Sequence, residues 1–192
     1  MTDSVIEKTS SPNAETSLFG YAIFAVALAL IIRFFVATPY IVSGASMEGT
    51  FQNHDYLIVD RVTYDLSEPV RGDVIVFGLP QEPSRDLIKR VIGLPGETVS
   101  ITNNSVSISN TEHPDGFKLE EPYLNPQNLG GSTGMKVTLG NDQYFVLGDN
   151  RKVSADSRLW GTLPRKDIIG RVLVRLFPFN MINLLPGEAR YN

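Results

Sequence analysis

An uncharged, strongly apolar run covers residues 18–32, and apolar side chains resume directly after Arg33. A helix over 18–38 would span roughly 30 Å at about 1.5 Å per residue, which is about the thickness of the hydrocarbon core of a bilayer. Pro39 disfavours a helical conformation at the residue before it, so we expect the helix to end there. The run therefore predicts one transmembrane helix over 18–38, preceded by a short polar tail over 1–17.

Two other interpretations of this run fit the sequence less well. A leader segment that is cleaved off has positive residues before its apolar stretch, whereas Lys8 is the one basic residue here beside Asp3, Glu7 and Glu15. A buried core helix is the other alternative, but this run is apolar on all sides. The orientation in a membrane stays open, because few basic residues flank the run at either end.

After residue 40 the apolar residues recur with a period of two, which is the period of β-strands. Asn103 and Asn104 separate two alternating segments, and asparagine tolerates the positive φ that a two-residue hairpin turn requires. The polar stretch over 112–140 is rich in Pro and Gly and predicts loops inserted in a β core. We expect a mainly β domain of short antiparallel strands over 39–192, with strands near 56–59, 74–77, 87–92, 99–101, 106–108, 144–147 and 168–176.

Composition and charge exclude several functional classes. The chain has 17 basic and 21 acidic side chains, a formal net charge of -4 and no cysteine. A nucleic-acid-binding surface would need a basic patch, and the lack of cysteine excludes disulfides, zinc–thiolate sites and a cysteine nucleophile. The two histidines, His54 and His113, lie in polar turns, so we expect neither a histidine-based catalytic triad nor a metal site.

Lys89 is the lysine whose local sequence best suits a general base. A free lysine has a pKa of about 10.4, and burial among apolar groups lowers that pKa because it destabilises the charged amine. In a strand, Leu87, Lys89 and Val91 point to one face, so the amine would lie between two aliphatic side chains. The alternative from the residues alone is a lysine at a sheet edge that keeps its amine in water.

Ser46 is the candidate nucleophile, a few residues after the predicted transmembrane helix. Its neighbours Gly44 and Ala45 are small, which lets a substrate backbone approach closely, and its own backbone N–H can contribute to an oxyanion hole. The alternative is a linker between the membrane and the β domain. On the local sequence alone, the linker is the simpler interpretation.

Four separated segments form an ordered set of motifs: SGASMEGT (43–50), RGDVIVF (71–77), KRVIGLPGE (89–97) and GDNRKVSADSR (148–158). In this order they resemble the motifs of type I signal peptidases, the bacterial leader peptidases with a serine–lysine dyad. The first resembles the nucleophile box, the second a structural strand, the third the general-base box and the fourth the last box of that family. The single anchor and the short chain are similar to the Gram-positive form.

The resemblance implies a serine endopeptidase that needs no metal or cofactor. Ser46 would attack the scissile carbonyl, the neutral amine of Lys89 would accept its proton, and Ser154 would hydrogen-bond and orient that amine. The remaining residues carried over by the resemblance are two structural ion pairs, Asp149 with Arg90 and Asp156 with Arg158, and two residues that line the pocket for small substrate side chains, Met47 and Ile88.

The resemblance also implies partners and a location. The family cleaves after Ala-x-Ala-like sites in secreted preproteins, on the outer face of the cytoplasmic membrane. We therefore expect signal peptides and membrane lipid as partners, a place beside the secretion translocase, and no role for nucleic acid. The chain would cross the membrane once, with the β domain on the extracytoplasmic side.

The chain departs from the family pattern at several positions. Gly49 stands where proline is usual, Phe51 where leucine is common, and Leu87 where tyrosine is frequent. Gly44 lacks the hydroxyl with which some members assist the oxyanion hole, so this chain would depend on backbone N–H groups. None of these departures removes a catalytic group.

Two other functions remain possible on the sequence. One is a self-cleaving serine–lysine domain of the repressor type, although an apolar run occupies the place of its DNA-binding module. The other is a non-enzymatic anchored β domain that binds envelope partners, which predicts that Lys89 titrates as an ordinary lysine.

Overall fold

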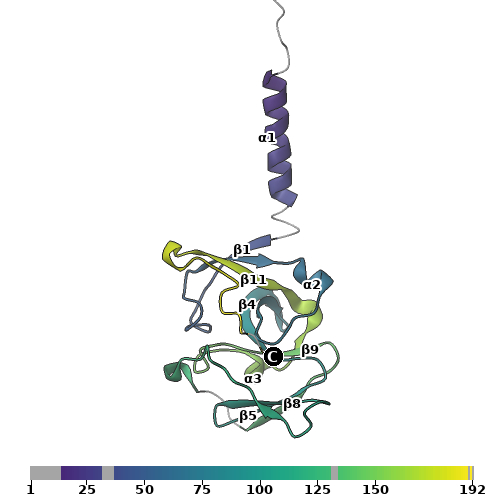
Figure 1. Cartoon of the computed structure of the whole chain (residues 1–192), viewed down its shortest axis with the longest axis vertical. Coiled ribbons are helices and arrows are strands. Elements are labelled where there is room, and N and C mark those ends of the chain that lie inside the picture. The colour runs from purple at the N-terminus through teal and green to yellow at the C-terminus, as the bar shows by residue number, and fades with distance from the viewer. Residues whose placement is uncertain (1–13, 32–36, 131–133, 190, 192) are drawn as a thin grey trace, which may run out of the picture.

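In the computed structural model, two antiparallel sheets form the body of the protein and helix α1 (Ala14–Ile31) projects away from them (Figure 1). The structure describes residues 14–31, 37–130, 134–189 and 191. Most of the alternating segments of the sequence form strands, which confirms the prediction of a mainly β fold.

The first sheet has eight strands in the order β1-β2-β11-β3-β4-β9-β10, with β12 paired to β11. These strands are β1 (Ala37–Ile41), β2 (Tyr56–Asp60), β3 (Val74–Leu79), β4 (Glu82–Gly93), β9 (Gln143–Leu147), β10 (Leu163–Pro164), β11 (Ile168–Phe177) and β12 (Asn183–Leu184).

The second sheet has four strands in the order β7-β6-β5-β8. These are β5 (Thr98–Thr102), β6 (Ser105–Ser109), β7 (Phe117–Lys118) and β8 (Met135–Thr138). Short helical turns connect the strands of both sheets: α2 (Thr63–Leu66), η2 (Pro126–Asn128), α3 (Ser157–Trp160), η3 (Arg165–Asp167) and η4 (Phe179–Met181).

The predicted hairpin around Asn103 and Asn104 is confirmed. Thr102 pairs with Ser105, and the two asparagines have φ angles of 50° and 63°. Two consecutive residues with positive φ are the requirement of a type I′ turn, which matches the twist of the flanking strands.

The segment over 112–140 contributes more than inserted loops. It supplies β7 and β8, which pair with β6 and β5. Its side chains Leu119 and Leu139 are buried in the same cluster as Phe145 of β9. The expectation of loops is wrong for these residues. A few apolar side chains in a polar stretch are enough to anchor it on the core, and its backbone then pairs as a short strand at the edge of the sheet.

The predicted helix over 18–38 is wrong at its C-terminal end. Helix α1 ends at Ile31, and Ala37 already belongs to β1, where it pairs with Asp60. Pro39 lies within this strand, and β1 is an edge strand, which is where a sheet tolerates proline. Residues 32–36 of the predicted span lie outside the described residues.

Among the described residues, no helix combines the length and the apolar character required to cross a membrane.

Candidate active site

Ser46 begins a turn that follows β1 and is held by backbone hydrogen bonds. The N–H groups of Thr50 and Phe51 donate to the carbonyl of Met47 at 3.1 and 2.8 Å, and the N–H of Asn150 donates to the carbonyl of Ser46 at 3.0 Å. The side chains of Met47 and Phe51 are buried beneath the turn. These contacts place Ser46 in the folded body of the protein, so the linker interpretation does not hold.

The backbone conformation at Gly49 accounts for one departure from the family pattern, the glycine that stands where proline is usual. Its φ angle is 108°, whereas a proline ring holds φ near about −65°, so proline cannot adopt this backbone conformation. The side-chain amide of Asn128 donates to the carbonyl of Glu48 at 2.9 Å. The loop around η2 therefore contacts the turn directly beside the glycine.

Lys89 lies in β4 opposite Ile75 of β3, and the lysine is only 2% exposed. Its Nζ is 2.8 Å from Oγ of Ser46 and donates to the carbonyl of Ile88 at 2.7 Å. The first distance lies within hydrogen-bond reach of a nucleophile and its base. The alternative of an edge lysine with its amine in water is wrong, because β4 buries this side chain.

Burial lowers the pKa of Lys89 to about 8, since the charged amine loses its hydration. The negative charges of Asp156 and Asp149 oppose this shift, and the positive charge of Arg85 adds to it. A pKa near 8 leaves an appreciable fraction of the amine neutral around neutral pH, as a general base requires.

Both ion pairs implied by the family resemblance are present. Asp149 binds Arg90 through two hydrogen bonds of 2.9 and 2.6 Å, and both side chains are almost completely buried. Asp156 binds Arg158 at 2.8 Å. The Asp149–Arg90 pair holds the segment over 148–158 against β4, whereas the Asp156–Arg158 pair lies within that segment.

Two expectations about site residues are wrong. Ser154 does not hydrogen-bond Lys89, and among the described residues its Oγ has no hydrogen-bond partner. It lies close by, because a Cβ on Gly148 would be 2.2 Å from Ser154 Oγ and 2.4 Å from the Ser46 carbonyl oxygen. Met47 does not line the pocket, since it is 1% exposed and packs in the core below the turn.

A narrow cleft of about 100 Å³ opens beside the Ser46–Lys89 pair. Ile88 lines it, as expected, together with Tyr40, Ile41, Val42, Ser43, Leu57, Val76, Asp86 and Leu87. The hydroxyl of Tyr40 donates to Asp86 at 3.0 Å. Burial and this hydrogen bond raise the pKa of Tyr40 to about 12, so the phenol stays protonated and can donate.

Sequence reasoning missed Tyr40, Asp86 and Thr50. Tyr40 follows a segment that was expected to be helical, and its contact with Asp86 joins residues 46 positions apart. Only the position of Asp86, three residues before Lys89, could have drawn attention to it. Thr50 lies inside the first motif, but no feature of the local sequence identifies Asp149 as its partner.

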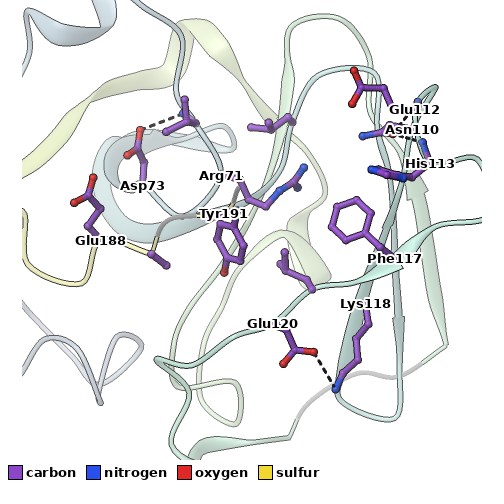
Figure 2. Close-up of a pocket in the computed structure, with 14 residues that line it drawn as sticks. Arg71, Asp73, Asn110, Glu112, His113, Phe117, Lys118, Glu120, Glu188 and Tyr191 are labelled. Carbon is purple, nitrogen blue, oxygen red and sulfur yellow. Dashed lines mark hydrogen bonds and ion pairs between the residues drawn. The ribbon is translucent and has the colours of Figure 1, made fainter.

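A larger cavity of about 820 Å³ lies between the β7 region and the C-terminal segment. Figure 2 shows Arg71, Phe117 and Tyr191 in it, with Lys118 and Glu120 paired at one side. Arg71 donates to Glu97 at 2.6 Å, so its charge is already balanced. Neither Ser46 nor Lys89 lines this cavity, and the reactive pair therefore belongs to the narrow cleft.

Comparison with known proteins gives consistent matches. Residues 16–177 match the family described as signal peptidase, peptidase S26. A signal peptidase I of Leptolyngbya laminosa is 42% identical over 86% of this chain and 81% of its own length. A probable signal peptidase I-2 of Synechocystis is 37% identical over 98% of this chain and 88% of its own. A signal peptidase I of Bacillus amyloliquefaciens is 36% identical, with coverages of 92% and 95%.

Proposed function

The chain belongs to the signal peptidase I family of serine peptidases, and we propose that it removes N-terminal signal peptides from secreted preproteins by cleaving after Ala-x-Ala-like sites. The observation that carries the proposal is the 2.8 Å separation between Ser46 Oγ and the buried Nζ of Lys89. A non-enzymatic β domain would have no use for this contact or for a lysine whose pKa is lowered to about 8.

In the proposed reaction, the neutral amine of Lys89 accepts the hydroxyl proton of Ser46 while Oγ attacks the carbonyl carbon before the scissile bond. The backbone N–H of Ser46 stabilises the oxyanion that forms. The ammonium of Lys89 then gives the proton to the leaving amine, the C–N bond breaks, and the signal peptide remains as an ester on Ser46. Lys89 next takes a proton from water while that water attacks the ester carbon. The ester C–O bond then breaks, the ammonium of Lys89 returns the proton to Oγ of Ser46, and the signal peptide leaves as a free acid that ionises to its carboxylate.

The narrow cleft supports a preference for small side chains. The cleft of about 100 Å³ next to the reactive pair would have to take two side chains of the substrate, which favours small ones at both positions. In an extended substrate, alternate side chains point to the same side. The residue at the cut and the residue two positions earlier would therefore both face the cleft, and the residue between them would point away.

We expect a preprotein with alanine at the cut to be cleaved, and its variant with leucine there to react about 10- to 200-fold more slowly. Rates are measured with the full chain in detergent, by the appearance of the mature protein. Leucine placed at the middle position is the control, and it should leave the rate unchanged. Equal rates for alanine and leucine at the cut would contradict the proposed specificity.

We further propose that the chain is anchored in the membrane by its apolar N-terminal run, with the β domain on the extracytoplasmic side. The side chains over 19–30 of α1 are exposed rather than packed on the sheets, for example Phe19 at 70% and Phe24 at 66%. The turn between β11 and β12 also exposes apolar side chains, including Phe179 and Ile182. In Figure 1 this turn (yellow-green) lies at the end of the β body from which α1 projects, so one bilayer could take up both. In this arrangement, the secretion translocase would be a neighbour that delivers the preprotein.

We expect the full chain to float with liposomes in a density gradient. The double variant Phe24→Asp/Leu28→Asp should stay at the bottom of the gradient, because each charge at the centre of a span costs about 2.5–3.5 kcal/mol. Leu66→Asp is the control, since Leu66 is an apolar residue of α2 that is even more exposed, at 84%. Flotation of the double variant at the wild-type level would contradict anchoring by this run.

A further inference from the structure

We infer that Thr50 is a positioning residue that holds the turn of Ser46 at its distance from Lys89. This inference rests on the serine–lysine chemistry proposed above. It concerns a hydroxyl that does not touch the reacting atoms and does not line the narrow cleft.

The hydroxyl of Thr50, a partly buried residue, is the third member of a network built on a buried ion pair. Its Oγ1 donates to Oδ2 of Asp149 at 2.5 Å and accepts a hydrogen bond from Nη2 of Arg90 at 3.3 Å. Arg90 and Asp149 are 0% and 1% exposed. A hydrogen bond from a hydroxyl to a buried carboxylate is short and strong, because the acceptor is charged and water does not compete.

The network joins the segments that carry the nucleophile and the base. Arg90 directly follows Lys89 in β4, whereas Thr50 ends the turn that begins at Ser46. The hydroxyl therefore links the strand of the base to the turn of the nucleophile through one ion pair. Apart from the Ser46–Lys89 contact itself, the other polar contacts of the turn reach elements other than β4. Asn150 contacts the Ser46 carbonyl and the Glu48 carboxylate, Asn128 contacts the Glu48 carbonyl, and Arg175 of β11 contacts the Thr50 carbonyl.

The packing around Thr50 fixes the direction of its hydroxyl. A Cβ on Gly187 would lie 2.3 Å from the Thr50 methyl group, so the C-terminal segment passes directly over this side chain. The carbonyl of Gly187 also accepts a hydrogen bond from Nη1 of Arg90. The threonine methyl thus packs against the C-terminal segment, and its Oγ1 donates to Asp149. Valine has the same shape and fits the same space without the hydroxyl.

The test compares Thr50→Val, which removes the hydroxyl, with Thr50→Ser, which keeps it. We expect Thr50→Val to lower kcat for preprotein cleavage roughly 10- to 100-fold, because a small displacement of the nucleophile from its base is costly. Its KM should stay within about twofold of the wild type, since the cleft is untouched. The rising limb of the pH–rate profile, which reports the pKa of Lys89, should move to higher pH, because a loosened Lys89 regains water. Thr50→Ser should restore kcat and the profile.

Each alternative result overturns the inference. If kcat and the pH profile of Thr50→Val equal those of the wild type, the hydroxyl does not position the dyad. If Thr50→Ser is as slow as Thr50→Val, the methyl group rather than the hydroxyl matters. If Thr50→Val does not fold, the hydroxyl supports the fold as a whole rather than the position of the dyad, and the inference fails. Ser46→Ala is assayed beside them: full activity there would reject the proposed dyad itself, whatever Thr50 does.

Discussion

Replacing Lys89 with methionine is expected to lower kcat/KM for preprotein cleavage at least about 1000-fold, and Ser46→Ala should have an effect of the same size. Methionine fills the buried space of the lysine without supplying a base, and alanine removes the attacking oxygen. The double variant should be no slower than either single variant, because the two groups act as one unit. The rates are measured as the appearance of mature protein.

The pH dependence provides a second measurement of the same prediction. The neutral amine is the reactive form, so kcat/KM of the wild type should rise with pH through the pKa of Lys89 at about 8 and then level off. Lys136→Met, a change at an exposed lysine in β8, is the control and should keep the wild-type rate and profile. A wild-type rate that still climbs towards the pKa of a free lysine, about 10.4, would reject the buried base. Full activity of Lys89→Met would do the same.

The second large effect is expected at the buried ion pair beside the dyad. Asp149→Asn should lower the free energy of unfolding by about 3–5 kcal/mol, because it leaves the guanidinium of Arg90 buried without its counter-charge. Arg90 is 0% exposed and donates two hydrogen bonds to this carboxylate. The measurement is urea unfolding of the full chain in one fixed detergent.

Two further variants make this prediction specific. Asp115→Asn removes an exposed carboxylate and should change the free energy of unfolding by less than about 0.5 kcal/mol. Replacing both partners, as in Arg90→Met/Asp149→Leu, should destabilise the protein less than Asp149→Asn alone, since no unpaired charge remains. An Asp149→Asn chain as stable as the Asp115→Asn control would contradict the prediction.

Local patterns predicted the elements that carry the site. The alternation around Lys89 predicted a strand, and β4 covers those residues. The two asparagines predicted a hairpin turn, which the register of β5 and β6 confirms. Such features depend on side-chain period and on backbone preference over a few residues. The C-terminal end of the first helix could not be predicted in this way. Ala37 and Thr38, which the prediction placed in the helix, form a strand because they pair with β2.

The residue pattern alone is enough to predict a mainly β fold, an apolar N-terminal run, and two residues with the chemistry of a nucleophile and a base. How these two residues meet depends on the tertiary packing. Ser46 and Lys89 are 43 residues apart, and their 2.8 Å contact depends on how the turn of Ser46 packs against β4. The same packing buries Met47 in the core and directs the Lys89 amine to Ser46 and the Ile88 carbonyl rather than to Ser154. Long-range distances of this kind arise from the packing of whole elements, which no short segment of sequence encodes.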